Sequence, residues 1–251
     1  MHNVLMKVMM AVLAWQIAAG ANAADLVVSA ASSLTNAFTD IGHDFEQAHP
    51  GTRVLFNYAG SGQLLQQIAR GAPVDVFASA DQETMDQAAA DQVIDPGSRF
   101  DFARNALVVV VPAASGPKLD NLRQLGDAAI QHIAIGNPQS VPVGRYSKAA
   151  LSAAGMWEAL KDKLVNTQNV RQCLDYVARG EVDAAFVYRT DAGILPGKVR
   201  VVLEVTTERP ILYPAAIVKG GGDKSDARRF MAFLRSEASQ RILRRYGFGK
   251  P

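Results

Sequence analysis

The stretch Leu26–Thr35, which reads LVVSAASSLT, joins a short apolar run to the start of an amphipathic pattern. The run Leu26–Val28 is typical of a buried β-strand, and the apolar residues from Leu34 to Phe45 recur at helical spacing. Small hydroxyl residues therefore stand where a strand gives way to a helix, which is where open α/β sheets bind ligands. A helix start also suits an anion, because it carries unpaired N–H groups and a partial positive charge. Taken alone, however, the stretch predicts only that Ser33 is a helix N-cap.

The same strand, turn and helix pattern occurs twice more in the next part of the chain. The strand-like run Arg53–Tyr58 is followed by Gly60–Gly62 and then by a helical pattern, so that Ser61 lies at a second helix start. The run Val74–Phe77 is followed by a helix for which Asp81 is the expected N-cap. Three successive strand–helix units predict a parallel sheet with helices on its faces.

A second set of units follows a long β-branched run. Ala106–Val111 predicts a fully buried strand, and His132–Gly136 begins the second set. Three helices are expected next: one from about Arg145 to Ala154 after the turn at Val143, a short one over 156–164, and one beginning at Val170 with Asn169 as its N-cap. Strands are expected over Ala184–Tyr188, 199–205 and 211–218, and two final helices follow them.

The order of these elements predicts an α/β protein with two lobes, each a mostly parallel sheet flanked by helices. Residues 24–107 are assigned to the first lobe and 108–210 to the second, and residues 211–251 return to the first. The runs near 106–111 and 211–218 are the expected crossing strands.

Residues 1–23 have the pattern of a secretory signal peptide. Lys7 provides a positive start, Val8–Ala19 is an apolar run too short for a comfortable membrane span, and Ala21–Ala23 matches the A-x-A cleavage pattern. Cleavage is expected after Ala23, which predicts a soluble, exported mature protein.

Composition excludes several classes of protein. The 251 residues carry a formal net charge of +2 without a basic run or an aromatic–basic stripe, so nucleic acid is not an expected partner. The single cysteine, Cys173, lies at helical spacing with apolar neighbours and is expected to be a buried core thiol without a disulfide partner.

The sequence does not favour an enzyme. The histidines of the mature chain, His43, His49 and His132, lie far apart and form neither a zinc motif nor a recognisable triad. A nucleophilic Ser33 or Ser61 would need a base within reach, and the local sequence suggests none. An exported serine hydrolase using Ser33 or Ser61 remains the alternative from a different class.

A series of motifs in one order gives the chain a resemblance to a known family. They are Ala30–Ala37, Gly60–Leu64, Gly71–Asp81, Gly136–Tyr146, Asn169–Arg171, Val187–Ala192 and Arg245–Phe248. With these motifs the chain resembles the periplasmic molybdate-binding proteins of ABC transporters over nearly all of its mature region. The resemblance implies a type II periplasmic-binding-protein fold, in which two lobes close on an oxyanion.

The resemblance also implies which groups hold that oxyanion. They are the hydroxyls of Ser33, Ser61 and Tyr188, with the backbone N–H groups of Val143 and Val170. Relatives often carry alanine where this chain has Val143, a change that a backbone donor survives. The glycines beside Ser61 replace serines that relatives often have, which removes a secondary donor. Molybdenum would be bound as the oxyanion through the same residues, with no direct cation ligand and no cofactor.

A site made only of donors has a consequence for selectivity. Molybdate, tungstate and sulfate are fully deprotonated near neutral pH, whereas monohydrogen phosphate carries a proton for which such a site has no acceptor. An unpaired buried polar group costs about 1–3 kcal/mol, which disfavours phosphate. The resemblance therefore implies a periplasmic receptor, expected to be a monomer, that delivers molybdate, and also tungstate, to a membrane permease. A receptor for another tetrahedral oxyanion such as sulfate remains open, because cavity size is not readable from sequence.

Overall fold

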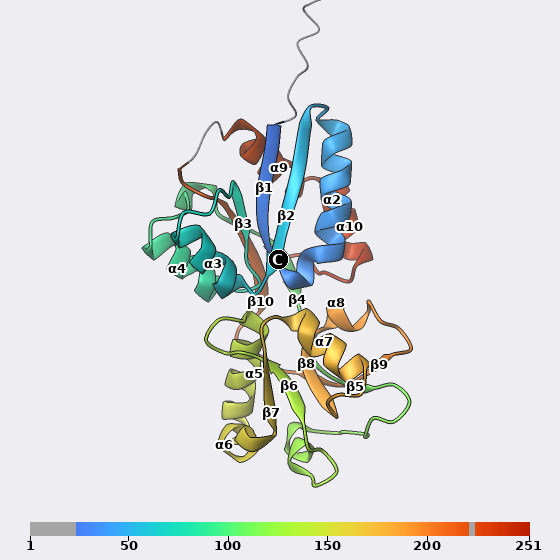
Figure 1. Ribbon diagram of the computed structural model, residues 1–251. Coiled ribbons are helices and arrows are strands. Elements are labelled where there is room, and N and C mark those ends of the chain that lie inside the picture. Colours follow the sequence, from blue (N-terminus) through green and yellow to red (C-terminus); the bar gives the residue numbers. More distant parts are fainter. Residues whose placement is uncertain (1–23, 221–223) are drawn as a thin grey trace, which may run out of the picture.

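The computed structural model describes residues 24–220 and 224–251, which form two lobes stacked one above the other (Figure 1). The expected signal peptide over residues 1–23 lies outside the described residues. Each lobe is built around a five-stranded sheet. The first sheet has the order β2 (Thr52–Ala59), β1 (Ala24–Ala31), β3 (Val76–Ala78), β10 (Ile211–Ile217) and β4 (Phe100–Asn105). The second has the order β7 (Leu164–Thr167), β6 (Ile133–Gly136), β8 (Ala184–Tyr188), β5 (Leu107–Pro112) and β9 (Val199–Val205).

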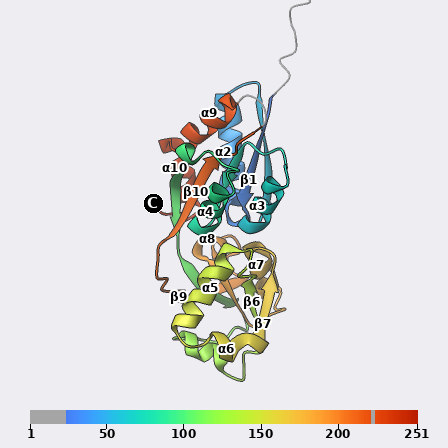
Figure 2. The same ribbon diagram turned by 90° about the vertical axis from the view of Figure 1, so that its left-hand side faces the viewer.

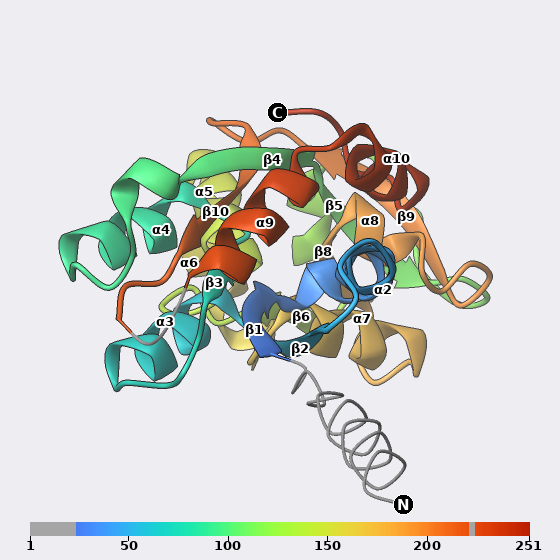
Figure 3. The ribbon, with the colours of Figure 1, turned by 90° about the horizontal axis from the view of Figure 1, so that it is seen from above.

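Helices cover both faces of the first sheet, because its central strands are apolar on both sides. On β3, Val76 and Ala78 face the core formed with α2 and α9, whereas Phe77 faces the core formed with α3 and α4. Seen from above, α3 and α4 lie on one side of the sheet and α2, α9 and α10 on the other (Figure 3). The bounds are α2 (Thr35–Ala48), α3 (Ser61–Ala69), α4 (Gln82–Ala90), α9 (Ser225–Leu234) and α10 (Glu237–Arg245).

The second lobe repeats the topology of the first. In the first sheet β1 pairs in parallel with β2 and β3, and in the second β6 pairs in parallel with β7 and β8. Antiparallel pairings then add β10 and β4 to the first sheet, and β5 and β9 to the second. Helices α5 and α7 both pack against β6 and β8. The bounds are α5 (Pro142–Ala153), α6 (Trp157–Leu160), α7 (Val170–Ala178) and α8 (Arg189–Ala192), with 3-10 helices η1 (Ser32–Leu34), η2 (Pro96–Ser98), η3 (Leu122–Gly126) and η4 (Lys161–Lys163).

Two extended segments cross between the lobes (Figure 2). In one, β4 leads into β5 through Ala106, and in the other β9 leads into β10 through residues 206–210. The two expected runs are the strands β5 and β10. Each is joined through a crossing segment to a strand of the other sheet, β5 to β4 and β10 to β9.

Two strands were not predicted from the sequence, β4 and β7, and both are edge strands. Both strands are partly exposed and carry polar residues, such as Asp101 in β4 and Asn166 in β7. Neither β4 nor β7 therefore has the continuous apolar run that predicts a buried strand. The short helix expected over 156–164 is present as α6 followed directly by the 3-10 helix η4, and only its last residue, Leu164, belongs to β7 instead.

Among residues 24–220 and 224–251, none of the helices combines the length and the apolar character that a membrane span requires.

Close packing between α5 and the end of β6 gives a test of the fold. A Cβ atom on the buried Gly144 would lie 1.9 Å from the carbonyl oxygen of Gly136. Because both groups are backbone, Gly144→Ala must displace the start of α5, and we expect a loss of about 1–3 kcal/mol of unfolding free energy. Gly193→Ala is the matched control, since its Cβ meets nothing closer than 3.5 Å. Urea titrations of both variants measure the difference, and equal stability would contradict the observed contact.

Candidate functional site

The five residues predicted to hold an anion lie around one small cavity between the lobes. Ser33 in η1 and Ser61 at the start of α3 come from the first lobe, and Val143, Val170 and Tyr188 come from the second. The cavity is narrow, with a volume of about 10 Å³, and all five residues are at most 3% exposed. The remaining lining residues are Ala31, Ser32, Ala59, Gly60, Ala80, Val141 and Pro142. The lining therefore contains no charged side chain.

Two helix starts lie at this cavity. Val143 is the second residue of α5, and Val170 is the first residue of α7. Such N–H groups have no carbonyl partner within their own helix. In α7 the expected N-cap, Asn169, is confirmed, because its side chain accepts from the N–H of Gln172 at 3.1 Å. That cap leaves the N–H of Val170 for another acceptor.

The hydroxyl of Ser61 is oriented by a neighbouring backbone group. Its Oγ accepts a hydrogen bond from the N–H of Ala80 at 3.1 Å. An amide N–H can only donate, so the hydroxyl hydrogen of Ser61 remains for a different acceptor. Ala80 also lines the cavity, just before Asp81, which caps α4 as expected.

The expectation that Ser33 caps a helix is wrong. A short 3-10 helix, η1, precedes α2, and neither helix has a side-chain cap at its start. The Oγ of Ser33 lies instead 3.1 Å from the Oη of Tyr213 on β10, and Asn105 on β4 donates to that same Oη at 3.1 Å. Tyr213 and Asn105 were not predicted. The sequence indicates them only weakly, as polar groups within or beside apolar strand runs.

Tyr188 ends β8, and its hydroxyl has an unusual environment. The hydroxyl is buried and has no hydrogen-bond partner within the described part of the chain. Burial is the main cause that raises the pKa of Tyr188 well above its ordinary value, and the neighbouring Tyr213 adds to it. The phenol therefore keeps its proton at neutral pH. A buried phenol without a partner costs free energy unless a ligand or a water satisfies it.

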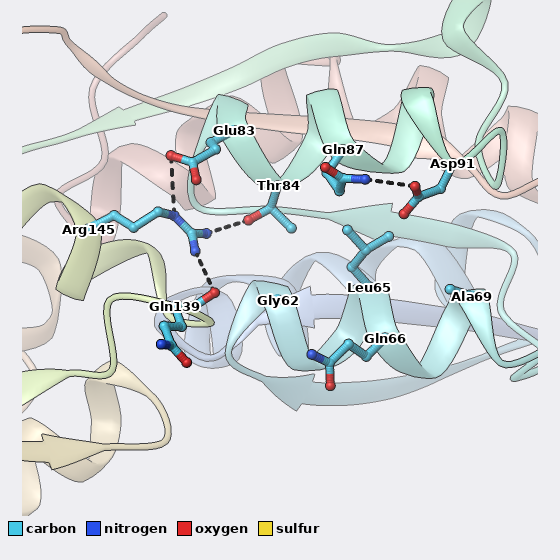
Figure 4. A pocket seen from close by; sticks show the side chains of 10 residues that line it. All are labelled: Gly62, Leu65, Gln66, Ala69, Glu83, Thr84, Gln87, Asp91, Gln139 and Arg145. Carbon is cyan, nitrogen blue, oxygen red and sulfur yellow. Dashed lines mark hydrogen bonds and ion pairs between the residues drawn. The ribbon is translucent and has the colours of Figure 1, made fainter.

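Arg145 links the lobes at the edge of the cleft (Figure 4). It extends from α5 in the second lobe, and its Nε lies 2.7 Å from Oδ2 of Asp81, in the first lobe. Its Nη2 donates to Oγ1 of Thr84 at 2.5 Å. Asp81 is 4% exposed at its side chain and Arg145 16%, so this ion pair is largely shielded from water.

Arg171 makes a second connection on α7. Its Nε pairs with Oδ1 of the buried Asp191 at 2.7 Å within the second lobe. Its Nη1 reaches Oδ1 of Asn36 at 2.9 Å, and its Nη2 reaches the carbonyl oxygen of Ser33 at 3.3 Å, both in the first lobe. Burial raises the pKa of Asp191 to about 6, and Arg171 opposes that rise. Both arginines were part of the motifs in the sequence, but their role between the lobes was not predicted.

Metal-ligating side chains do not gather in the described ranges, where no group of three or more His, Cys, Asp or Glu residues could hold an ion. Cys173 is a buried core thiol, as expected, and lies 2.9 Å from Oγ1 of Thr167. Burial raises its pKa to about 12, which makes it a poor metal ligand or nucleophile at neutral pH.

Comparison with known proteins gives a consistent result. The chain is 36% identical to the putative ABC transporter substrate-binding lipoprotein YvgL of Bacillus subtilis, over 89% of this chain and 85% of that protein. It is 37% identical to the molybdate-binding protein ModA of Escherichia coli, over 89% of this chain and 88% of that protein. Its structure matches the periplasmic molybdate-binding protein of Azotobacter vinelandii with a TM-score of 0.78 and 28% identity. The match covers 90% of this chain and 99% of the other.

These likenesses confirm the expected two-lobed fold of periplasmic binding proteins. The matching family model covers residues 14–249, which is nearly the whole chain. The chain therefore belongs to the family of bacterial extracellular solute-binding proteins.

Proposed function

We propose that this protein is an extracytoplasmic receptor that binds molybdate, and also tungstate, in the cavity between its lobes. The observation that carries the proposal is the buried hydroxyl of Tyr188, which has no partner in the described chain although it lines a cavity of neutral donors. The relatives named as molybdate-binding proteins favour molybdate among the tetrahedral oxyanions.

A dianion can be buried there because hydrogen bonds replace its hydration. The hydroxyls of Ser33, Ser61 and Tyr188 and the N–H groups of Val143 and Val170 supply five donors, and the two serine N–H groups would raise the number to seven. Burying a charge costs several kcal/mol unless its hydrogen-bonding capacity is met. Helix starts add favourable potential without a cationic side chain, so the charge of the anion is offset while its release remains possible.

Lobe closure completes the site, because neither lobe holds all the donors. The contacts of Arg145 with Asp81 and of Arg171 with Asn36 connect the lobes in the closed arrangement. Opening must break both connections and expose the anion to water. Such a cycle suits a protein that captures a solute and passes it to an ABC permease.

The rival proposal of a serine hydrolase is less well supported. Among the described residues, no histidine and no carboxylate lines the cavity that contains Ser33 and Ser61. A serine nucleophile requires such a base within hydrogen-bond reach. We therefore propose binding without covalent chemistry or cofactor, by a monomer exported to the periplasm.

Calorimetry with four oxyanions tests the ligand. We expect tight binding of molybdate and tungstate, weaker binding of the smaller sulfate, and the weakest binding of phosphate, whose proton is unmatched when every hydroxyl in the cavity donates. Sulfate that binds as tightly as molybdate would contradict the molybdate assignment while leaving an oxyanion receptor.

Removal of single donors tests the site. We expect Tyr188→Phe and Ser61→Ala each to weaken molybdate binding by about ten- to a hundredfold, because hydrogen bonds to charged groups contribute roughly 1.5–3 kcal/mol. Tyr176→Phe, on α7 but outside the cavity lining, is the control and should bind as the unaltered protein does. If both cavity variants retain full affinity, the assigned donors are wrong.

The interlobe ion pair predicts an effect on release. Arg145→Gln should speed molybdate dissociation several-fold, since a shielded pair that holds only the closed form contributes about 1 kcal/mol. Arg99→Gln is the matched control, because Arg99 pairs with Asp86 within the first lobe at 2.7 Å. Stopped-flow competition with tungstate measures both rates. Equal dissociation from the two variants would show that Arg145 does not hold the lobes together.

A further inference from the structure

The side-chain amide of Asn105 has one possible orientation. Its Oδ1 accepts from the N–H of Ala106 at 2.9 Å, and a backbone N–H can only donate. The amide nitrogen must therefore face the other way, where it lies 2.9 Å from Oγ1 of Thr190 and 3.1 Å from Oη of Tyr213. Asn105 is thus a donor to Tyr213.

The direction of the next hydrogen bond follows from this one. Because the oxygen of Tyr213 accepts from Asn105, its own proton is available for Ser33, whose Oγ lies 3.1 Å away. The ring of Tyr213 is fully buried and contacts Tyr188 and Phe248 at centroid distances of 5.8 and 5.4 Å, so the hydroxyl is held in place. Burial also raises the pKa of Tyr213 well above its ordinary value, so the proton stays on the phenol.

The hydroxyl of Ser33 is consequently polarised toward the cavity. Its oxygen accepts from Tyr213, and its hydrogen remains for a ligand. The N–H of Ala80 has the same effect on Ser61 from a different direction. This matters because a free serine hydroxyl can rotate and either donate or accept. Because one of the two lone pairs of the Ser33 oxygen is already engaged, fewer of its orientations can accept a proton from a ligand, and the site favours an anion without one.

We propose that Asn105 and Tyr213 are positioning residues that favour Ser33 as a hydrogen-bond donor, and that they thereby select against tetrahedral oxyanions carrying a proton. This inference rests on the proposed function of the cavity as an oxyanion site. It extends that function by naming residues outside the cavity that determine which protonation state of an anion is bound.

Selenate and hydrogen arsenate are suitable probes for this selection. Both are tetrahedral dianions of similar size at mildly alkaline pH, and only hydrogen arsenate carries a proton. The ratio of their dissociation constants therefore reports the direction of the hydrogen bonds, while effects of charge and size largely cancel. Calorimetric displacement of each anion by molybdate gives the ratio even where binding is weak.

Asn105→Asp reverses the chain of hydrogen bonds with little change of shape. The new carboxylate oxygen accepts from Tyr213, whose oxygen then accepts from Ser33, so that Ser33 presents lone pairs to the cavity. The preference for selenate over hydrogen arsenate should fall by about tenfold or more, since an unmatched polar group then opposes selenate instead of arsenate. The added negative charge weakens both dianions alike.

Tyr213→Phe provides the second variant and the control. It retains the ring but breaks the chain, so the preference should fall by a smaller factor as Ser33 becomes free to rotate. In the Tyr213→Phe background, Asn105→Asp should change the ratio no further, because no hydroxyl connects residue 105 to Ser33. Thermal unfolding confirms that each variant is folded.

The outcomes separate this inference from the proposed function. Unaltered protein that binds none of these oxyanions, molybdate included, overturns the proposed function and the inference with it. Unaltered protein that binds molybdate, with an unchanged ratio in Asn105→Asp, overturns the inference alone. If Asn105→Asp does not fold, Tyr213→Phe takes its place: an unchanged ratio of the selenate and hydrogen arsenate dissociation constants in that variant overturns the inference.

Discussion

The need to satisfy a buried dianion with hydrogen bonds, without a cation in the cavity, is the constraint on which the arrangement of both lobes depends. No charged side chain lines the cavity, and the two arginines beside it pair with Asp81 and Asp191. An anion held by neutral donors gains enough to leave water and yet can be released when the lobes separate. A lysine or arginine in direct contact would strengthen capture at the expense of release.

The fold places the five proposed donors at one repeated structural position. Each of the five groups lies at or just beyond the carboxyl end of a parallel strand: Ser33 follows β1, Ser61 follows β2, Val143 follows β6, Val170 follows β7, and Tyr188 ends β8. Ligands bind at this edge in open α/β sheets because helix starts gather there. Since the two lobes have the same topology, their ligand-binding edges face each other across the cleft.

Much of this organisation was predictable because it is local. A strand, a small turn and a helix start can be recognised within about ten residues, and the five predicted residues do line one cavity. The polar edge strands β4 and β7 were missed because half-exposed strands lack an apolar run. The direction of the Ser33 hydroxyl could not be predicted, since it depends on Tyr213, which is 180 residues away, and through it on Asn105. The contacts of Arg145 and Arg171 between the lobes could not be predicted either, because they join residues far apart in the chain.

A crystal structure of the protein with molybdate, measured at the molybdenum absorption edge, would locate the anion without ambiguity. We expect one strong anomalous peak in the cavity between the lobes, within hydrogen-bond reach of the Tyr188 hydroxyl and of Ser33 and Ser61. The basic surface pocket lined by Lys219, Lys224 and Arg235 is the main alternative location in the described structure. A peak there, with the Tyr188 hydroxyl still lacking a ligand, would show that the cavity between the lobes is not the molybdate site.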